Sequence, residues 1–456
     1  MPKTLRSCGL VLFLVATLGC TGGIPDLDGG YQGHNVLLIS VDTLRADRLG
    51  CYGYERPTPV LDALAEQSYV FESMFTTSST TFPAHVSLMT GLHPKDLRNG
   101  FFLTESATTL AEILEQTGYQ TLAVVSSLPL DSRFGLDQGF ARYESDFSDC
   151  HGTSSGQKWY AVHDYDVFEC SAAETTQRVL TKIDEVPPDG PFFLWVHYFD
   201  PHLPYTPPEG TYDPGLVSRT DFPFFHEATD EDLDSLNALY DGEVQFVDQQ
   251  IGVLLDELES RGLREDTIIA IVGDHGENLY QHDGFLGHSR VVYDTVMRIP
   301  GILHVPGRPG ARVEGLTDIT DVMPTLLGLL GIPGAGLEGE NLVGALASED
   351  PVTSRPYVAC ETNDFLMKDP DQTIAIRTRQ AKYIMNNWNR KGHTFFDLVS
   401  DPDETQPLQH PPAAQSELLR THYTDWKERL KIGQLASGAD LDEATLEAFR
   451  ALGYLQ

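Results

Sequence analysis

The sequence predicts an α/β protein built as a three-layer sandwich, with a large, mostly parallel sheet between helices and a small antiparallel subdomain at the C-terminal end. Three observations predict this fold. Short apolar runs without polar alternation recur in the first part of the chain, as in strands buried on both faces. Segments of helical period separate these runs, and such alternation favours a parallel sheet covered by helices. Beyond residue 350 the apolar runs become shorter.

Four apolar runs predict the central strands. They are NVLLISVD (35–42), QTLAVVSS (120–127), PFFLWVH (191–197) and TIIAIVGDH (267–275). The carboxyl ends of parallel strands meet at one edge of a sheet, where ligands of such folds bind. Asp42, His197, Asp274 and His275 all lie at the ends of these runs. The sequence therefore predicts a functional site at that edge.

Helices are predicted between the strands and after them. The segments of helical period are 59–68, 107–119, 172–186, 233–262 and 319–332. In the C-terminal part, 356–363, 373–387 and 392–404 predict short antiparallel strands, and a polar helical stretch begins at Ser416. We therefore predict a catalytic domain over residues 33–350 and a C-terminal subdomain with a helical tail over residues 351–456.

The first twenty residues predict a targeting signal. Lys3 and Arg6 precede an apolar stretch, Gly9–Gly19, which is too short to span a bilayer comfortably. The stretch ends in TLGC, and Cys20 resembles the lipidated cysteine of a bacterial lipoprotein signal. Plain secretion and an uncleaved anchor are the alternatives. All three place the protein outside the cytoplasm, and a lipid anchor would be its only link to a bacterial membrane facing the periplasm or the exterior.

The charge composition argues against a nucleic-acid partner and is compatible with bound divalent cations. Lys and Arg number 31 against 67 Asp and Glu, so the formal charge is −36, which argues against nucleic-acid binding. The acidity favours solubility, or carboxylates that hold divalent cations.

Cys150 and Cys170 flank a polar stretch, which predicts a loop closed by a disulfide in an oxidising compartment.

The stretch TTFPAHVSLMTG (80–91) allows two interpretations of Thr81. A threonine before a proline in a first helical turn is good capping chemistry. The alternative is a nucleophile, because Asp42, Thr81, Asp274 and His275 together form a ligand set suited to a divalent cation, Zn²⁺, Mn²⁺ or Ca²⁺. A bound cation and the positive end of the following helix would both lower the pKa of the Thr81 hydroxyl.

Several motifs in order resemble those of bacterial members of the sulfatase family, within the alkaline phosphatase superfamily. They are NVLLISVDTLRADRLGCYGY, FPAHVSLMTGLHP, FFLWVHYFDPHLPY, IVGDHGE and YDTVMRIPGIL, from about Asn35 to Pro300. The resemblance implies an alkaline phosphatase-like sheet. It also implies that Asp42 and the Asp274–His275 pair bind a metal, and that Thr81 and His85 occupy the nucleophile and arginine places of the family's Cys-or-Ser-x-Pro-x-Arg motif.

This sequence departs from the family where the sulfatase nucleophile stands. Sulfatases oxidise Cys or Ser to formylglycine, and Thr81 cannot form that aldehyde, so no formylglycine is expected. Thr43 replaces the second aspartate of the usual pair. TFPAH resembles instead the Thr-Phe-Pro-x-His motif of the nucleotide pyrophosphatase/phosphodiesterases, and the metal set also resembles that of phosphoethanolamine and lipoteichoic-acid transferases. Both resemblances imply a covalent phospho-intermediate on Thr81.

The remaining histidines complete the predicted site. His197, His202 and His288, beside His85, are expected to contact the substrate or to protonate the leaving oxygen. One metal ion is expected. A second ion held by Asp200, His202 and His288 is the alternative.

The predicted function is a metal-dependent hydrolase that cleaves a phosphate or sulfate ester through Thr81, with phosphorus favoured by the chemistry. The substrate is expected to be a small-molecule, lipid or glycan ester. One alternative is a transferase that moves a phospho-alcohol group to a lipid or glycan acceptor. The others are an arylsulfatase-like sulfuric ester hydrolase without formylglycine, and a binding protein that has lost catalysis.

Overall fold

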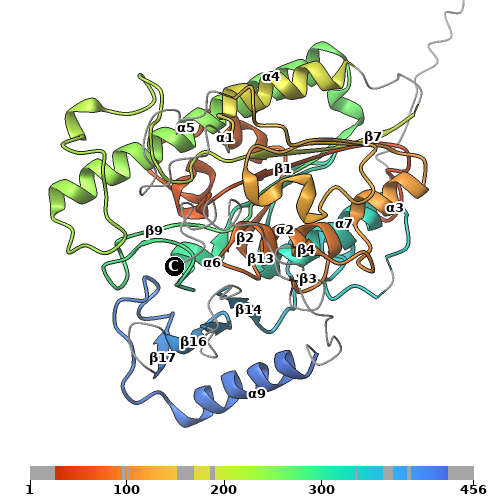
Figure 1. Ribbon diagram of the computed structural model, residues 1–456. Coiled ribbons are helices and arrows are strands. Elements are labelled where there is room, and N and C mark those ends of the chain that lie inside the picture. The colour runs from red at the N-terminus through yellow and green to blue at the C-terminus, as the bar shows by residue number, and fades with distance from the viewer. Residues whose placement is uncertain are drawn as a thin grey trace, which may run out of the picture.

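The computed structural model describes residues 26–94, 98–99, 102–150, 169–184, 190–334, 336–362, 373–387 and 392–429, and it has the predicted α/β architecture (Figure 1). The predicted signal at residues 1–20 lies outside the described residues, as do 151–168 and the end of the predicted tail. Cys150 and Cys170 form the expected disulfide, with Cα atoms 5.1 Å apart. None of the described helices is both long and apolar enough to cross a membrane.

The four predicted strands form the parallel centre of the large sheet. β1 (Asn35–Val41) lies between β7 (Phe192–Tyr198) and β8 (Thr267–Gly273), and β5 (Gln120–Val124) and β6 (Arg142–Glu144) continue the sheet beyond β7. Val41 lies opposite both Tyr198 and Gly273. The three central strands therefore end at the same level, and the residues that follow them emerge at one edge.

The other half of the sheet is mixed. β12 (Gly301–His304) runs antiparallel to β8 and to β2 (Tyr69–Phe75), which also pairs with β11 (Arg298–Ile299) and with β13 (Ala311–Asp318). β2, β12 and β13 were not predicted from the sequence. β2 carries half-buried Glu72 and Ser73 in its middle, and β12 has only four residues, so neither forms a long apolar run.

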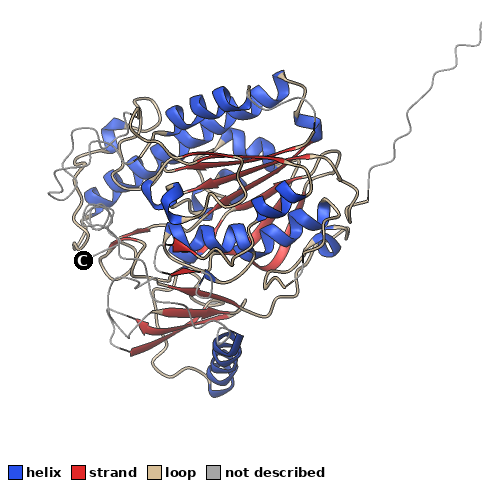
Figure 2. Cartoon of the chain, turned by 45° about the vertical axis from the view of Figure 1, so that its right-hand side comes forward, coloured by secondary structure: helices blue, strands red, loops and turns tan. Residues whose placement is uncertain are grey.

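Helices cover both faces of the sheet (Figure 2). α1 (Pro59–Ala65), α4 (Ala172–Ile183) and α5 (Asp230–Ser260) pack on the face that includes Leu37 and Ile39. α2 (Thr81–Thr90), α3 (Leu110–Gln116) and α7 (Val322–Leu329) pack on the face that includes Val36 and Leu38. Alternate residues of a strand point to opposite faces, so one apolar run supplies both cores.

Short elements connect these layers. They are the strand pairs β3 (Arg98–Asn99) with β4 (Phe102–Leu103) and β9 (Asn278–Leu279) with β10 (Leu286–Gly287), and the helices α6 (Asp294–Met297) and α8 (Val343–Leu346). α6 lies between the large sheet and the C-terminal part of the chain (Figure 1).

The C-terminal part forms the small antiparallel sheet that the sequence predicts. Its strands follow in order as β14 (Val358–Glu361), β15 (Ile374–Arg377), β16 (Ala381–Asn387) and β17 (Gly392–Asp397). One face packs against α9 (Ala413–Arg429), and the other contributes Val358 and Cys360 to a core shared with Phe75 of the large sheet. The small sheet is therefore packed directly against the layer that carries the site.

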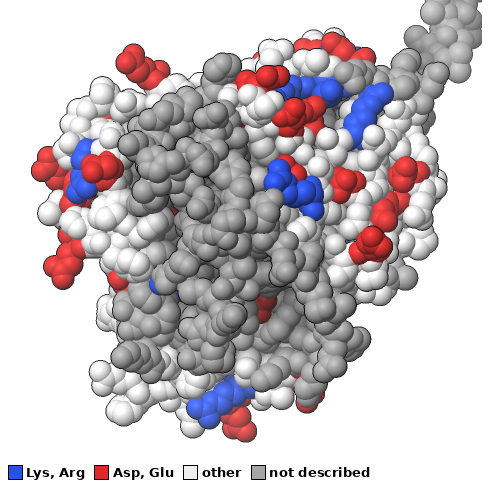
Figure 3. Space-filling model, in the orientation of Figure 1, with Lys and Arg blue, Asp and Glu red and all other residues white. Residues whose placement is uncertain are grey.

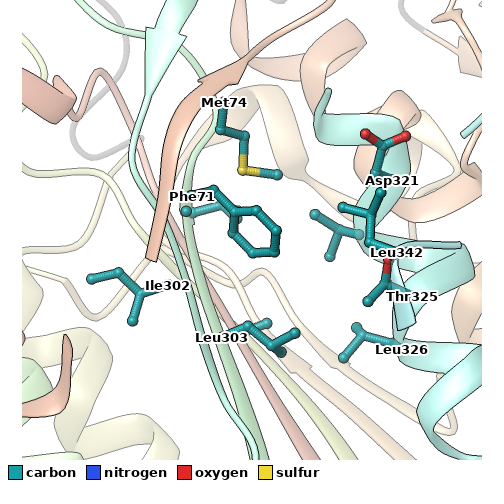
Figure 4. Close-up of a pocket in the computed structure, with 12 residues that line it drawn as sticks. Phe71, Met74, Ile302, Leu303, Asp321, Thr325, Leu326 and Leu342 are labelled. Atoms are coloured by element: carbon teal, nitrogen blue, oxygen red, sulfur yellow. Dashed lines mark hydrogen bonds between the residues drawn. The ribbon is translucent and has the colours of Figure 1, made fainter. Parts of the chain in front are cut away.

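A narrow cavity lies between the large sheet and α7 (Figure 4). Phe71 and Met74 of β2, Leu303 of β12 and Leu326 of α7 line it. The lining is apolar except for Asp321 and Thr325, and it includes none of the predicted site residues. It lacks the convergent polar groups of a binding site and is a void in the core.

The negative charge is spread over the surface. On the face shown in Figure 3, the described acidic side chains lie apart from one another with basic side chains among them. A basic stripe, which nucleic-acid binding needs, is not formed by the described residues of this face.

Candidate metal and nucleophile site

Backbone hydrogen bonds at the ends of the central strands bring two aspartates together. The Asp42 amide donates to the Tyr198 carbonyl oxygen at 2.9 Å, and the Asp274 amide donates to the Val41 carbonyl oxygen at 3.3 Å. Both aspartates are completely buried. The sheet register thus places side chains from residues 42 and 274 beside each other.

Thr81 is the first residue of α2, and its hydroxyl points at these aspartates. Thr81 Oγ1 donates to Asp42 Oδ2 at 3.1 Å and lies 3.4 Å from His275 Nε2. The N-cap residue is Thr80, whose side chain makes no capping hydrogen bond. The position of Thr81 therefore fits a group that acts at the site while its helix places a positive end there.

Asp42, Asp274 and His275 bring ligand atoms within 4.8 Å of one another. Asp274 Oδ1 accepts from the amides of Thr43 and His275, at 3.1 and 2.6 Å. Asp274 Oδ2 and Asp42 Oδ1 are buried without a hydrogen-bond partner among the described atoms. His275 Nδ1 donates to the Gly276 carbonyl oxygen at 3.0 Å, which leaves the Nε2 lone pair for a ligand.

The electrostatics of this group also fit a cation. Burial, and then the nearby Asp274, raise the pKa of Asp42 well above its ordinary value. Burial likewise raises the pKa of Asp274, and it lowers the pKa of His275, which keeps that imidazole neutral. Two buried carboxylates with a neutral histidine and a hydroxyl are a donor set that suits a divalent cation.

His197 faces the same space from β7. Ser126 Oγ donates to the His197 carbonyl oxygen at 2.6 Å, so it accepts from His197 Nδ1 at 3.1 Å. The Nε2 lone pair then lies 3.6 Å from Asp42 Oδ2, and Nε2 has no hydrogen-bond partner in the described part of the chain. Burial lowers the pKa of His197 well below its ordinary value. The neutral Nε2 of His197 therefore adds another possible ligand atom beside Asp42 Oδ2.

His85 lies behind Thr81, with both ring nitrogens already bonded. His85 Nδ1 donates to the Thr81 carbonyl oxygen at 2.8 Å, so in the neutral ring Nε2 accepts the Ser40 hydroxyl proton at 2.9 Å. Trp195 Nε1 donates to the same Ser40 oxygen at 2.9 Å. His85 is completely buried, and burial lowers its pKa to about 4. This geometry makes His85 a support for Thr81 and leaves it no nitrogen for the substrate.

His85, His197 and Asp274 form a second set of ligand atoms within 4.8 Å. His85 Nδ1 lies 3.7 Å from Asp274 Oδ2, but its proton is directed at Thr81. A nitrogen that carries a proton has no lone pair for a metal. Asp42, Asp274 and His275 are therefore the better ligand set.

His202 and His288 lie next to the candidate metal ligands. The His288 ring is 4.3 Å from that of His275 and 5.2 Å from that of His202, measured between centroids. His288 Nδ1 is 3.1 Å from Glu277 Oε1, and His202 Nδ1 donates to the Leu203 carbonyl oxygen at 2.7 Å. Burial lowers the pKa of His202 to about 3. Glu277 thus places a buried carboxylate against the His288 ring.

The second metal site at Asp200, His202 and His288 is a prediction that the structure corrects. Among the described residues, these three do not bring their ligand atoms together. Asp200 instead lies with Glu243 in the lining of a small pocket, where the two carboxyls interact. Burial raises the pKa of Asp200 to about 6, and burial followed by Asp200 raises that of Glu243 well above its ordinary value. The raised pKa values favour a proton on this buried pair, so Asp200 has a partner of its own in Glu243.

Three groups that hold the site residues have no role predicted from the sequence. Glu277 positions His288, Ser40 donates to His85 Nε2, and Arg45 Nη1 donates to the Glu277 carbonyl oxygen at 2.9 Å. Glu277 stands three residues after Asp274 in the same motif, which was the available signal. Ser40 lies inside an apolar run, and nothing in the sequence links it to residue 85.

Known proteins similar to this chain share one family. A model of the sulfatase family matches residues 34–332. An ulvan-active sulfatase of Formosa agariphila is 28% identical over 405 residues, which cover 83% of this chain and 77% of that protein.

Two solved structures have the same fold. One holds its substrate, D-glucosamine-2-N,6-O-disulfate; it has a TM-score of 0.71 and 18% identity, and the match covers 88% of this chain and 99% of that one. The other is the phosphonate monoester hydrolase of Agrobacterium radiobacter, with a TM-score of 0.69, 23% identity and coverage of 87% and 95%. The likeness extends to enzymes of sulfur and of phosphorus chemistry.

Proposed function

The chain belongs to the sulfatase family of ester hydrolases, and on that basis we propose that Thr81 is the nucleophile of a metal-dependent phosphoester hydrolase. One observation carries the proposal. The Thr81 hydroxyl, at the start of α2, donates to Asp42 Oδ2 and lies beside a buried set of ligand atoms from Asp42, Asp274 and His275. A capping role would direct the hydroxyl at the amides of its own helix.

A divalent cation held by Asp42, Asp274 and His275 would lower the pKa of the Thr81 hydroxyl and offset the charge of the ester oxygens. Asp42 Oδ2 accepts the hydroxyl proton as Thr81 Oγ1 attacks phosphorus. The bond from Thr81 to phosphorus forms while the bond to the leaving oxygen breaks. Water then attacks phosphorus as the bond to Thr81 Oγ1 breaks, and the phosphate product leaves. Asp42 returns its proton to Thr81 Oγ1, and the proton lost by the water restores the general acid. His85 holds the Thr81 carbonyl oxygen throughout, so the hydroxyl keeps its direction.

We assign protonation of the leaving oxygen to His288. Its Nδ1 lies 3.1 Å from Glu277 Oε1, which holds the ring beside His275, and a positioned imidazole is the usual general acid. His197 faces Asp42 instead, and burial disfavours the protonated form of His202. His288 is thus the histidine whose ring a buried carboxylate positions at the candidate site.

Phosphorus is favoured over sulfur because of the nucleophile. A threonine hydroxyl cannot become the aldehyde hydrate with which sulfatases attack sulfur, yet it forms a stable ester with phosphate. A sulfuric ester is the second candidate, since the similar ulvan-active protein is a sulfatase. We further propose that the protein works outside the cytoplasm, supported by the signal-like first twenty residues and by the Cys150–Cys170 disulfide.

The test compares aryl phosphate monoesters, phosphodiesters, phosphonates and sulfates on the metal-loaded protein. We expect turnover of a phosphorus ester, and quenched reactions should contain phosphorylated Thr81 by mass spectrometry. Thr81→Ala should lose the activity and the phosphopeptide together. Thr81→Ser is the matched control, because it keeps the hydroxyl and should keep both.

Full activity in Thr81→Ala would remove the nucleophile assignment. A clear preference for the sulfate ester would replace phosphorus by sulfur and leave the site assignment standing. A strong acceleration by added alcohols, with the ester group appearing on the alcohol, would identify a transferase. No turnover of any ester by the metal-loaded protein would favour a binding protein.

A further inference from the structure

A second buried cluster of charged side chains joins the C-terminal sheet to the site-bearing layer. Lys382 of β16 is completely buried, and its Nζ lies 2.8 Å from Asp294 Oδ1 and 2.8 Å from Glu404 Oε1. Arg377 of β15 binds the same aspartate, with Nη2 3.0 Å from Oδ2. The cluster holds two cations and two anions. Its centre is Asp294, the first residue of α6.

The backbone of Asp294 is held as well. Its amide donates to Glu404 Oε2. Burial raises the pKa of Asp294, but Arg377 and Lys382 outweigh burial and hold it well below its ordinary value. The start of α6 is therefore fixed by three side chains from the C-terminal part of the chain.

The other end of α6 is hydrogen-bonded to the segment that carries His275 and to the segment that leads into Thr81. The Val296 carbonyl oxygen accepts from the Gly276 amide at 2.8 Å, and the Met297 carbonyl oxygen accepts from the Thr76 amide at 2.9 Å. Gly276 follows His275, and Thr76 begins the segment that leads into Thr81. α6 thus fixes the backbone next to a metal ligand and the backbone before the nucleophile.

The contact between α6 and Gly276 affects the candidate metal ligand His275 directly. The Gly276 carbonyl oxygen accepts from His275 Nδ1 and so sets the direction of Nε2. A Cβ at residue 276 would stand 2.2 Å from the Thr295 carbonyl oxygen, so this loop lies tight against α6. A shift of α6 must therefore move the His275 ring.

The C-terminal sheet also pairs with the nucleophile segment itself. The Ser79 amide donates to the Glu361 carbonyl oxygen at 3.1 Å, and the Glu361 amide donates to the Thr77 carbonyl oxygen at 2.9 Å. Arg377 lies over the ring of Phe75, 4.4 Å from its centroid. The C-terminal part of the chain therefore contacts residues 75–79 from two sides.

From these contacts we infer that Lys382 and Asp294 are positioning residues, through which the C-terminal sheet sets the geometry of His275 and Thr81. The inference rests on the proposed metal-dependent function. Neither residue touches the substrate. Their effect passes through α6 to Gly276 on one side and to Thr76 on the other.

The test measures metal affinity and turnover in Lys382→Met. Binding of Zn²⁺ and of Mn²⁺ to the metal-depleted full chain is followed by calorimetry, and kcat and KM are measured on the phosphorus ester that wild type turns over. We expect the metal dissociation constant to rise and kcat to fall, each by roughly 10- to 100-fold, as for residues that orient a metal ligand. KM should change little, and Lys382→Arg should restore much of both.

Two variants keep the test decisive. Lys382→Met with Glu404→Gln removes one charge of each sign, so it should fold even if the single variant does not, and it should keep the weaker metal binding. Arg379→Ala is the matched control, because Arg379 and its partner Glu314 are exposed at 57% and 63%. It should leave the dissociation constant and kcat unchanged.

The outcomes separate the inference from the proposed function. Wild-type metal affinity and kcat in the folded double variant would overturn the inference alone. Failure of wild type to bind either ion would overturn the proposed metal centre and the inference with it. Weakened binding and lower kcat in the double variant, with restoration by Lys382→Arg, would support the inference.

Discussion

Two buried charged clusters lie on opposite sides of α6, and they differ in how their charge is balanced. At the candidate site, Asp42 and Asp274 face each other with neutral His275, and two of their oxygens have no partner among the described atoms. In the cluster around Asp294, the chain supplies its own cations, Arg377 and Lys382.

This difference in charge balance separates a cluster that can bind a cation from a cluster that only holds the structure together. A buried carboxylate needs a compensating charge or a proton, because burial disfavours its charged form. Burial dominates at Asp42 and raises its pKa, whereas the cations dominate at Asp294 and lower its pKa. The balanced cluster is complete without a ligand. The unbalanced cluster is where an external cation would be bound.

The largest expected effect is on the unbalanced cluster. Asp274→Asn should lower kcat/KM roughly 10⁴-fold, on the scale seen when one member of a catalytic unit is removed. The metal-free variant should unfold at a higher temperature than metal-free wild type, because one of two repelling buried carboxylates is gone. Scanning calorimetry in chelator checks this result. If the metal-free variant were less stable than metal-free wild type, Asp42 and Asp274 would not be an uncompensated pair of buried carboxylates.

The same substitution in the balanced cluster should have the opposite effect on stability. Asp294→Asn leaves Arg377 and Lys382 with only Glu404, so the free energy of unfolding should fall by about 3 kcal/mol. Urea unfolding of the metal-free protein measures it. An unchanged midpoint would mean that the cluster contributes nothing to the C-terminal packing.

A third buried group, Asp200 with Glu243, is balanced by a proton and should depend on pH. Burial raises the folded-state pKa of Asp200 from 3.8 to about 6, so its contribution is present below the unfolded value and is lost as pH rises through about 6. The melting temperature of wild type should therefore fall between about pH 4 and about pH 6. The melting temperature of Glu243→Gln should fall less over the same pH range. An equal fall would contradict a proton held by Asp200 and Glu243.

The smallest effect is expected where the charges are exposed. Arg379→Ala breaks an ion pair with Glu314 that water already screens, so stability should change by less than about 0.5 kcal/mol. Urea unfolding beside Asp294→Asn gives the comparison. A loss as large as that of Asp294→Asn would show that burial is not what separates the clusters.

The sequence predicted the parts of the fold that have a local signal. The runs at 35–42, 191–197 and 267–275 became the three central strands, because a strand buried on both faces must be apolar throughout. β2 and β12 escaped prediction, since half-buried polar residues and short length erase that pattern. The small antiparallel sheet was predicted as a class, without its packing against Phe75.

The candidate site divides in the same way. Asp42, Asp274 and His275 were identifiable because strand ends meet at one edge, and Thr81 because of its motif. The role of His85 was not, because it depends on Ser40 and Trp195, which are distant in sequence. The alternative of a second metal at Asp200, His202 and His288 could not be judged from the sequence, because nothing in it says that Asp200 interacts with Glu243.

By itself, the sequence determined which residue types could do the chemistry and on which edge of the sheet they would lie, since apolar patterning and strand direction are local properties. Only the tertiary structure decided which charges meet. Asp42 reaches Thr81, Asp200 turns to Glu243, and Lys382 reaches Asp294 across 88 residues of chain. Such pairings depend on how separate elements pack together, and that packing is fixed by the whole core.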